Sequence, residues 1–170
     1  MSWHWRRGLV ELICDTSVVT ALHEVRLLKI LPLLGSKIIL PAAVEREIEA
    51  GRSSGYDLPD VASIDWIVVR TPIDTLELPN AKQLGDGESN VLWLALEIPN
   101  SVAVLDDGAA RRTAIQMGIR FTGTLGLLLD AKQKSLIEKV APVLDELIHH
   151  DFNMSPSVRA NILKAAGEVD

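Results

Sequence analysis

Five short apolar segments alternate with stretches in which apolar residues recur every three or four positions, and this alternation constrains the fold most. The short segments have the character of buried strands, and the longer stretches have the period of helices. Parallel strands need helical crossovers, which cover both faces of the sheet. We therefore expect an α/β fold with a parallel sheet whose strands are residues 9–14, 37–40, 66–69, 102–105 and 119–122.

The expected helices are bounded by capping residues, prolines and glycines. Pro41 suits a first helical turn, Gly35, Gly51 and Gly118 suit helix ends, and Ser155 suits an N-cap. Residues 84–88 form a turn that opens a helix, and residues 52–60 are expected to form a mobile surface loop. The helices are expected at residues 18–34, 41–50, 89–97, 109–117, 124–133, 139–150 and 156–166.

Length, charge and cysteine content restrict the class of protein. The 170 residues fit one domain, and a net charge of −6 excludes a protein that holds nucleic acid by overall charge. The single cysteine, Cys14, lies in an apolar segment, which excludes a disulfide framework and suits a reducing compartment. Arg6 and Arg7 precede no apolar signal segment, and no segment has the roughly 18 apolar residues of a membrane span. We expect a cytoplasmic protein without a membrane partner.

Acidic residues stand where two of the expected strands end. Asp15 follows the first strand, and Asp106 and Asp107 follow the fourth. In the common doubly wound order these strands are neighbours where strand order reverses, and ligands bind outside their carboxyl ends. Asp15 alone fits a helix N-cap equally well, but two carboxylates at one edge repel each other unless a cation lies between them. Such oxygen ligands favour Mg²⁺ and phosphodiester chemistry.

Two further acidic pairs lie between these strands in the sequence. Glu45 and Glu47 are two positions apart on a helix and point to different sides, so we expect Glu47 to face the site and Glu45 to face solvent. Asp86 and Glu88 flank Gly87 at a helix start, where the dipole also favours acids as simple caps. Glu88, already inside the helix, is less well explained as a cap than Asp86.

The segment after the fourth strand contributes candidate substrate ligands. Either Asp106 or Asp107 could cap the next helix while the other binds a cation. Arg111 or Arg112, one turn later, could reach a phosphate, although a solvated helix face is the commoner reason for such a pair.

The remaining polar residues have less specific signals. Thr122 and Thr124 place hydroxyls at the same sheet edge, where they would hold water at the cation or cap the following helix. The histidines show no metal-binding spacing and are interpreted as structural or surface groups: His4, His23, His149 and His150. The chain lacks a nucleophile elbow, a phosphate-binding loop with lysine and a GxGxxG turn, which disfavours several enzyme classes.

Taken in order, these motifs resemble the PIN domain, the nuclease fold of VapC-type toxins. They are Ile13-Cys14-Asp15-Thr16-Ser17, Pro41-x-x-Val44-x-x-Glu47-Ile48, Gly85-Asp86-Gly87-Glu88 and Leu105-Asp106-Asp107. The match extends to Arg111 and to residues 121–128, which resemble a PIN-related prokaryotic subgroup, and it covers most of the chain.

The resemblance implies a three-layer fold with a five-stranded parallel sheet, in one nuclease domain of residues 1–170 that cleaves single-stranded RNA. It implies Mg²⁺ or Mn²⁺ held by Asp15, Glu47, Glu88 and one of Asp106 or Asp107. It also implies frequent homodimers and, for members of toxin–antitoxin systems, a neutralising antitoxin protein. In many PIN proteins aspartate stands where this chain has Glu88.

Three functional hypotheses follow. The leading one is a metal-dependent endoribonuclease, a hydrolase in which Arg111, Thr122 and Thr124 contact the substrate. The second is a catalytically weak PIN-fold module that binds a protein through the apolar face of helix 156–166, with Val158, Ile162 and Leu163. The third is a metal-dependent phosphate-ester hydrolase acting on small molecules.

Overall fold

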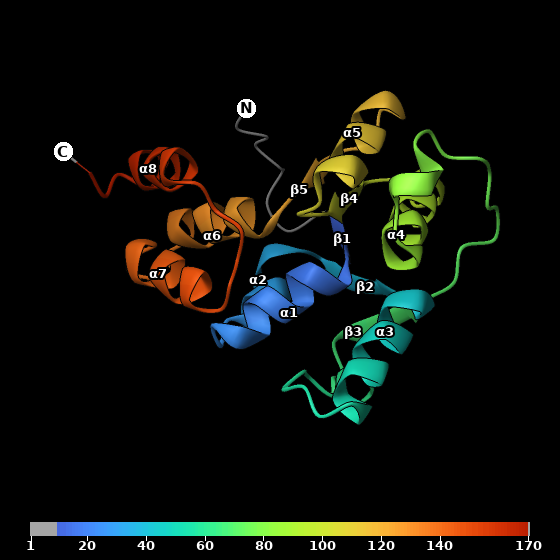
Figure 1. The fold of residues 1–170 in the computed structure, drawn as a ribbon, viewed down its shortest axis with the longest axis horizontal. Coiled ribbons are helices and arrows are strands. Elements are labelled where there is room, and N and C mark those ends of the chain that lie inside the picture. Colours follow the sequence, from blue (N-terminus) through green and yellow to red (C-terminus); the bar gives the residue numbers. More distant parts are fainter. Residues whose placement is uncertain (1–9, 170) are drawn as a thin grey trace.

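The computed structural model describes residues 10–169, and its centre is one parallel sheet between layers of helices (Figure 1). The strands lie in the order β3-β2-β1-β4-β5, with every pairing parallel. The expected α/β class and the five-stranded parallel sheet are therefore confirmed. The strands are β1 (Glu11–Cys14), β2 (Lys37–Pro41), β3 (Ile67–Arg70), β4 (Ser101–Val104) and β5 (Phe121–Thr122).

The strand bounds differ from expectation by one or two residues. Trp66 and Ile119 precede their strands rather than opening them, and Leu105 lies beyond the end of β4. Leu9, expected in the first strand, lies outside the described residues. The same holds for His4, Arg6 and Arg7.

The two acid-bearing strands are neighbours at the centre of the sheet. Ile13 of β1 pairs with Ile39 of β2 on one side and with Ala103 of β4 on the other, and all three are fully buried. The pairing continues past the strand end, because the Asp15 N–H donates to the carbonyl of Val104 at 3.2 Å. The carboxyl ends of β1 and β4 therefore hold their acidic residues at one edge, at the point where strand order reverses.

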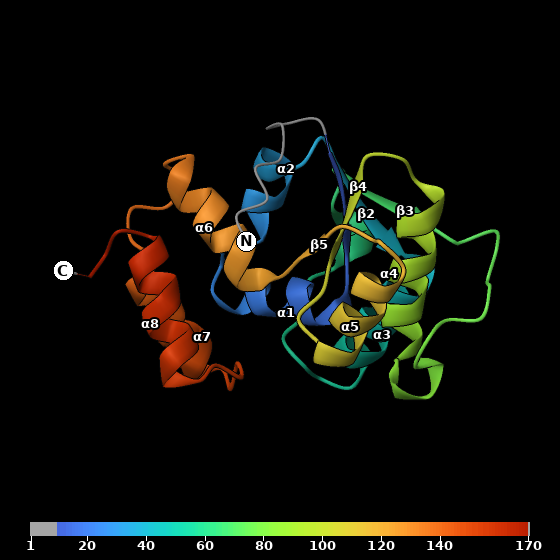
Figure 2. The same cartoon turned by 90° about the horizontal axis from the view of Figure 1, so that it is seen from above.

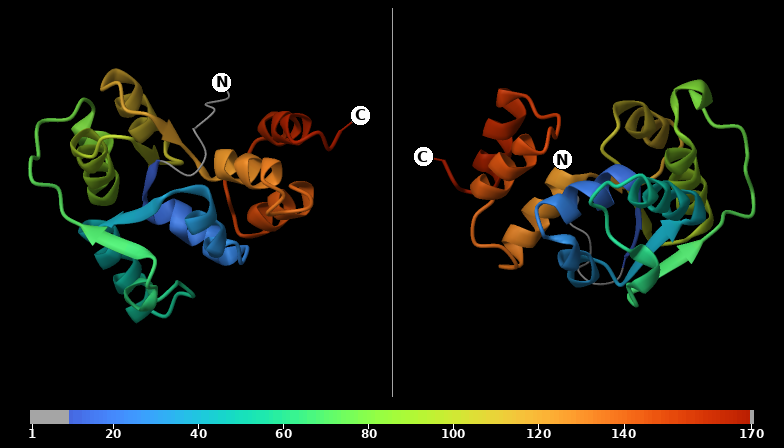
Figure 3. Two further views of the ribbon diagram at one scale, coloured as in Figure 1. Left: turned by 180° about the vertical axis from the view of Figure 1, so that it is seen from behind. Right: turned by 60° about the horizontal axis from the view of Figure 1, so that its bottom comes forward.

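The helices form two layers with an additional pair outside one of them. Helices α4 and α5 lie on one side of the sheet, and α1, α2 and α6 lie on the other, with α7 and α8 beyond α6 (Figure 2). Helix α3 lies between α1 and α4 and contacts both (Figure 3). The α-helices are α1 (Thr16–Glu24), α2 (Leu31–Leu34), α3 (Ala42–Ser53), α4 (Asp86–Glu97), α5 (Gly108–Gln116), α6 (Thr124–Gln133), α7 (Ala141–His149) and α8 (Pro156–Ala165). Short 3₁₀ turns are η1 (Leu28–Ile30), η2 (Val61–Ser63) and η3 (Ala81–Gln83).

The single helix expected over residues 18–34 is wrong, because the chain turns after α1. Arg26 takes the left-handed conformation with φ 60°, and its N–H donates to the carbonyl of His23 at 3.0 Å. The next N–H, of Leu27, reaches back to Leu22 at 2.8 Å, which completes a helix-ending Schellman turn. Glycine usually fills this position, so no sequence signal marked the break.

Gly51 does not end α3, and Pro41 belongs to β2 rather than to a helix. A Cβ built on Gly51 would lie 2.5 Å from Cδ1 of Leu58, so the Leu58 side chain packs directly against this glycine. The helix continues to Ser53, and Gly55, with φ 93°, follows it. The expected loop over residues 52–60 is therefore shorter.

The C-terminal helices are fastened to the rest of the chain. The Glu168 carboxylate accepts the N–H groups of Val140 and Ala141 at the start of α7 and pairs with Lys132 of α6. These contacts lower the pKa of Glu168 despite the opposing effect of its desolvation. Ser155 caps α8 as expected, accepting the N–H of Val158 at 3.2 Å.

The apolar face of α8 is largely used within the chain. Leu163 is buried and Ile162 packs against the core, so of the three residues expected to meet a protein partner only Val158 is exposed. The apolar face of α8 therefore gives little reason to expect a protein-binding module there.

In the stretch from residue 10 to residue 169, no helix is long and apolar enough to cross a bilayer.

Candidate metal centre

Asp15 is the most deeply buried carboxylate at the sheet edge. Its residue is 5% exposed, held between the end of β1 and the first turn of α1. The pKa of Asp15 is raised to about 7, chiefly by desolvation and also by the charges of Glu88 and Glu47. Hydrogen bonds from the Thr16 N–H and the Ser17 hydroxyl oppose this rise. Close to neutral pH this carboxyl group is therefore poised between its protonated and ionised forms.

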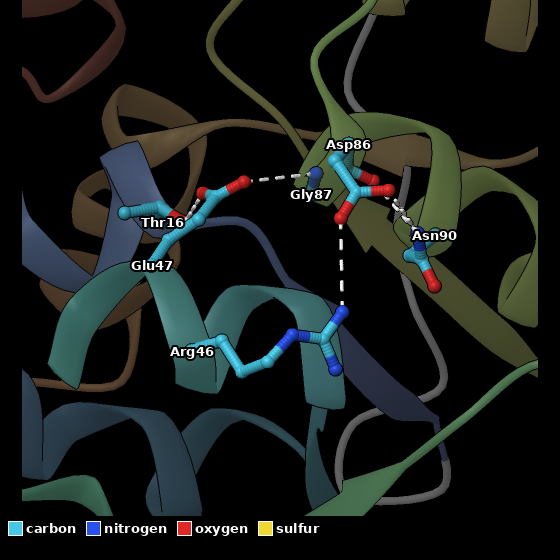
Figure 4. Close-up of polar contacts among 6 residues, drawn as sticks. All are labelled: Thr16, Arg46, Glu47, Asp86, Gly87 and Asn90. Carbon is cyan, nitrogen blue, oxygen red and sulfur yellow. Dashed lines mark hydrogen bonds and ion pairs between the residues drawn. The ribbon is translucent and has the colours of Figure 1, made fainter. Parts of the chain in front are cut away.

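Glu47 faces Asp15 from helix α3 and is held at both oxygens. Its Oε1 accepts the backbone N–H of Gly87 at 3.0 Å, and its Oε2 accepts the hydroxyl proton of Thr16 (Figure 4). These bonds come from α4 and α1, so three helices meet at this carboxylate. The structure thus turns Glu47 toward the acidic edge.

Gly87 marks the point where the two carboxylates converge. A Cβ built on this glycine would lie 3.0 Å from Oδ1 of Asp15 and 3.0 Å from each oxygen of Glu47. The oxygens of the two residues can therefore be no further apart than twice that distance. Carboxylate oxygens with this spacing can bind one hydrated divalent ion directly or through its water.

Glu88 rather than Asp86 caps α4, so the sequence-based preference for Asp86 is wrong. The Gly85 N–H donates to Oε2 of Glu88 at 2.8 Å, because a glutamate at the third helical position is long enough to reach back. Asp86 instead pairs with Arg46 at 3.7 Å and accepts from Asn90 (Figure 4).

Glu88 nevertheless stays within electrostatic reach of the other acids. Desolvation raises its pKa, and the charges of Asp107 and Glu47 add to this, while the Gly85 N–H opposes it. Asp15, Glu47, Glu88 and Asp107 therefore share one negative field.

The two adjacent aspartates have different partners. Asp107 caps α5, with Oδ1 accepting the N–H of Ala110 at 3.0 Å. Asp106 accepts two bonds from Thr124, the N–H at 2.8 Å and the hydroxyl at 2.6 Å. Asp106 therefore links the end of β4 to the start of α6.

Arg111 lines the wall beside Asp106. Its Nε donates to the carbonyl of Leu105 at 2.8 Å, and its Nη2 lies 3.8 Å from Oδ1 of Asp106. Its guanidinium also stacks over Phe121, with Cζ 5.9 Å from the ring centroid. The side chain remains 39% exposed, so it can still meet a phosphate. Arg112 points elsewhere, toward Gln83 at 3.4 Å.

The two threonines lie behind the acidic edge. Thr124 is fully buried and its hydroxyl is bonded to Asp106, while Thr122 is half-buried with its hydroxyl against Gly126. Neither side chain caps α6, which follows Gly123, so the capping alternative is wrong. Thr124 orients Asp106 in this arrangement.

A family model described as a PIN domain matches residues 11–168. The chain belongs to the PIN-domain family. PIN proteins are generally nucleases, hydrolases that act on RNA and use divalent metal ions, so membership supports a nuclease-type function.

Comparisons with solved structures and with curated proteins show less similarity. The PIN domain is similar to the solved PIN domain endonuclease Utp24, at 12% identity and a TM-score of 0.46, over 66% of this chain and 84% of that one. This likeness adds nothing to what the sheet order shows. No curated protein matches the sequence.

The acidic edge of this PIN domain suits a hard divalent ion. Across the described chain, no three histidine, cysteine, aspartate or glutamate side chains lie close enough to hold one ion together. Mg²⁺ usually needs only one or two carboxylates and keeps several waters, and Asp15 and Glu47 supply that pair. Burial raises the pKa of the Cys14 thiol, helped by the charges of Asp15 and Asp106, and so favours its neutral form. The charged donor groups at this edge are carboxylates.

Sequence reasoning missed two residues of the PIN site. Thr16, which holds Glu47, was identified from the sequence only as part of the motif Ile13-Cys14-Asp15-Thr16-Ser17. The Gly87 N–H, which also holds Glu47, is a backbone group and has no signature beyond the glycine itself. The Gly-Asp-Gly-Glu turn was the available signal, because glycine allows close approach of other groups.

Gly123→Ala should disturb the packing around Arg111 and Asp106. The new Cβ would collide with Nη2 of Arg111 and lie 2.7 Å from Oδ1 of Asp106 and 3.0 Å from the Leu105 carbonyl oxygen. We expect the free energy of unfolding, measured in urea, to fall by roughly 1–3 kcal/mol. Gly108→Ala is the control, because its Cβ meets only the end of the Arg112 side chain at 3.3 Å. Equal stability of the two variants would contradict this packing.

Proposed function

We propose that this protein is a metal-dependent endoribonuclease that hydrolyses phosphodiester bonds in single-stranded RNA, with residues 1–170 acting as one nuclease domain. The observation that carries the proposal is the convergence of Asp15 and Glu47 at Gly87, within a PIN fold. The charges of Glu88 and Asp107 intensify the negative field there.

The proposed cofactor is Mg²⁺ or Mn²⁺, held by Asp15 and Glu47 with water in its remaining positions. Glu88, Asp106 and Asp107, expected from the sequence to be ligands, do not join this pair closely enough to share its ion and act through their charge. When bound, the ion lowers the pKa of a water molecule and offsets the negative charge that develops on the phosphate. The oxygen-only donor set supports this choice of ion.

The side chains around the site have distinct proposed roles. Asp15, buried at the end of β1, would hold the ion directly. Thr16 and the Gly87 N–H fix the orientation of Glu47, and this pre-set geometry saves reorganisation during the reaction. Arg111, bonded to the Leu105 carbonyl but partly exposed, would contact an RNA phosphate.

Comparing Glu47→Gln with Glu45→Gln tests the proposal. The two positions lie on the same helix and the substitutions remove the same charge, but the acidic-edge contacts belong to Glu47. We expect Glu47→Gln to weaken Mn²⁺ binding, measured by calorimetry, by at least about tenfold. Substitutions of residues outside a metal's coordination shell already weaken binding by this factor. Cleavage of single-stranded RNA should fall with it.

The control, Glu45→Gln, should keep the affinity and the cleavage rate of the wild type. Equal behaviour of the two variants would reject the site. Hydrolysis of a generic phosphomonoester without cleavage of RNA would instead identify a small-molecule phosphatase.

We further propose a toxin-type role in a toxin–antitoxin pair, as a cytoplasmic homodimer. The PIN family supports this extension, and the buried free thiol of Cys14 suits a reducing compartment. Light scattering of the purified protein tests the dimer, and growth arrest on expression, relieved by a co-expressed neighbouring gene product, tests the toxin role. A monomer, or normal growth, would reject the corresponding part.

A further inference from the structure

A cavity lies at the end of α1 that is remote from Asp15. It has a volume of about 550 Å³, within the range typical of small-ligand sites. Its walls come from the α1–η1 turn on one side and from residues 59–66, which lead into β3, on the other. At 1.5 Å per residue, the nine residues of α1 separate it from Asp15 by roughly 14 Å.

The cavity concentrates positive charge in an acidic protein. Arg26 and Lys29 line it, and Asp60 is its single acidic lining residue. Asp60 lies 3.5 Å from Arg52, which also pairs with Glu49 at 2.6 Å, and His23 of the lining lies 3.2 Å from Asp57. The side chains of Arg26 and Lys29 are exposed and form no ion pair with any other residue between 10 and 169. An anionic ligand is therefore complementary to this cavity.

The backbone conformation fixes the position of the Arg26 Cα. Arg26 has the positive φ of the turn that ends α1, and hydrogen bonds on both sides of it lock that turn. Its Cα is therefore held at the rim of the cavity, and only the side chain needs to order when a ligand binds.

An aromatic wall accompanies the charge. Trp66 lines the cavity while the rest of its ring packs against the core, and Leu28 and Ile64 add apolar surface. A half-buried indole offers a stacking platform to a flat ring, and nucleobases stack on aromatic side chains without regard to sequence. Proteins that bind single-stranded nucleic acids combine cationic side chains with an aromatic side chain on which a base stacks.

We propose that this cavity binds one nucleotide unit, with its base on Trp66 and its phosphate on Arg26 and Lys29. Its assignment as a subsite for the RNA strand, remote from the Asp15–Glu47 pair, rests on the proposed function. A free nucleotide has the same chemistry, and the test below separates the two sources.

Binding is measured in EDTA, so that no metal is present and no cleavage occurs. The probes are AMP, by calorimetry, and a short fluorescein-labelled oligoribonucleotide, by anisotropy. The test variant is R26Q/K29Q, and the matched control is K139Q/K164Q, which loses the same charge from exposed lysines of the C-terminal region. We expect R26Q/K29Q to bind at least about tenfold more weakly, and the salt slope of oligonucleotide binding to fall by roughly 0.7, for the one phosphate that the two cations share.

Each outcome decides the proposal. Weaker binding of both probes assigns the cavity to free nucleotides as well as RNA, and weaker binding of the oligonucleotide alone assigns it to the strand. Affinities of R26Q/K29Q equal to those of K139Q/K164Q would overturn it. Circular dichroism first checks that Trp66→Leu is folded. Wild type should bind an oligonucleotide with bases more tightly than an abasic one, and Trp66→Leu should bind the two with equal affinity. Because no cleavage is measured, failure here leaves the nuclease test with Glu47 unaffected, and the reverse also holds.

Discussion

Asp15→Asn should abolish metal-dependent RNA cleavage and at the same time stabilise the metal-free protein. The substitution removes one of the two carboxylates that converge at Gly87 and would hold the ion. We expect the cleavage rate to fall by at least about a hundredfold, since changes even outside a metal's coordination shell cost roughly 10–100-fold. A labelled RNA in Mn²⁺ measures this, and undiminished cleavage would remove Asp15 from the site.

The stability effect follows from the direction of the pKa shift. The pKa of Asp15 is about 7 in the folded protein and about 3.9 in an unfolded chain, so the folded state binds more protons between these values. The contribution of Asp15 to stability is therefore fully present below about pH 4 and is lost as the pH rises to about 7. Above that, burying the ionised group costs up to about 4 kcal/mol.

The expected result in EDTA is a higher melting temperature for Asp15→Asn than for wild type at pH 8. The difference should shrink as the pH falls toward 4, because wild-type Asp15 becomes neutral there. Asp86→Asn is the control, since it makes the same substitution at an exposed side chain and relieves no burial. A difference that is the same at both pH values would show that Asp15 does not carry the burial penalty.

Gly87→Ala should separate folding from activity. Alanine favours helix formation over glycine, so α4 should form at least as readily. The added methyl group, however, would lie 3.0 Å from the oxygens of Asp15 and Glu47, closer than carbon and oxygen normally approach, and those carboxylates must move apart. We expect an unchanged or higher melting temperature with at least about tenfold loss of Mn²⁺ affinity and of RNA cleavage.

Gly85→Ala provides the comparison for that variant. It lies in the same turn, but its Cβ would meet Oε2 of Glu88 at an ordinary 3.6 Å. It should retain most of the metal affinity. If Gly87→Ala binds Mn²⁺ as tightly as Gly85→Ala, the ion does not lie between Asp15 and Glu47.

Local sequence signals were sufficient where the structure depends on neighbouring residues. Short apolar runs specified the five strands, and the spacing of Glu45 and Glu47 showed that they face different sides of α3. They failed where side-chain reach decided the outcome, as in the capping of α4 by Glu88 instead of Asp86. The break after α1 was missed because Arg26 adopts a backbone conformation for which glycine is the usual signal.

By itself, the sequence determined the alternation of strands and helices and the presence of acids at the strand ends, because both follow from the period of apolar residues and the residues that interrupt it. Only the tertiary structure decided which oxygens meet. The contact of Glu47 with Thr16 and Gly87 joins residues 31 and 40 positions apart. The cavity of Arg26 and Trp66 likewise depends on packing between distant segments. Such contacts are set by how the layers fit together, and no local pattern encodes them.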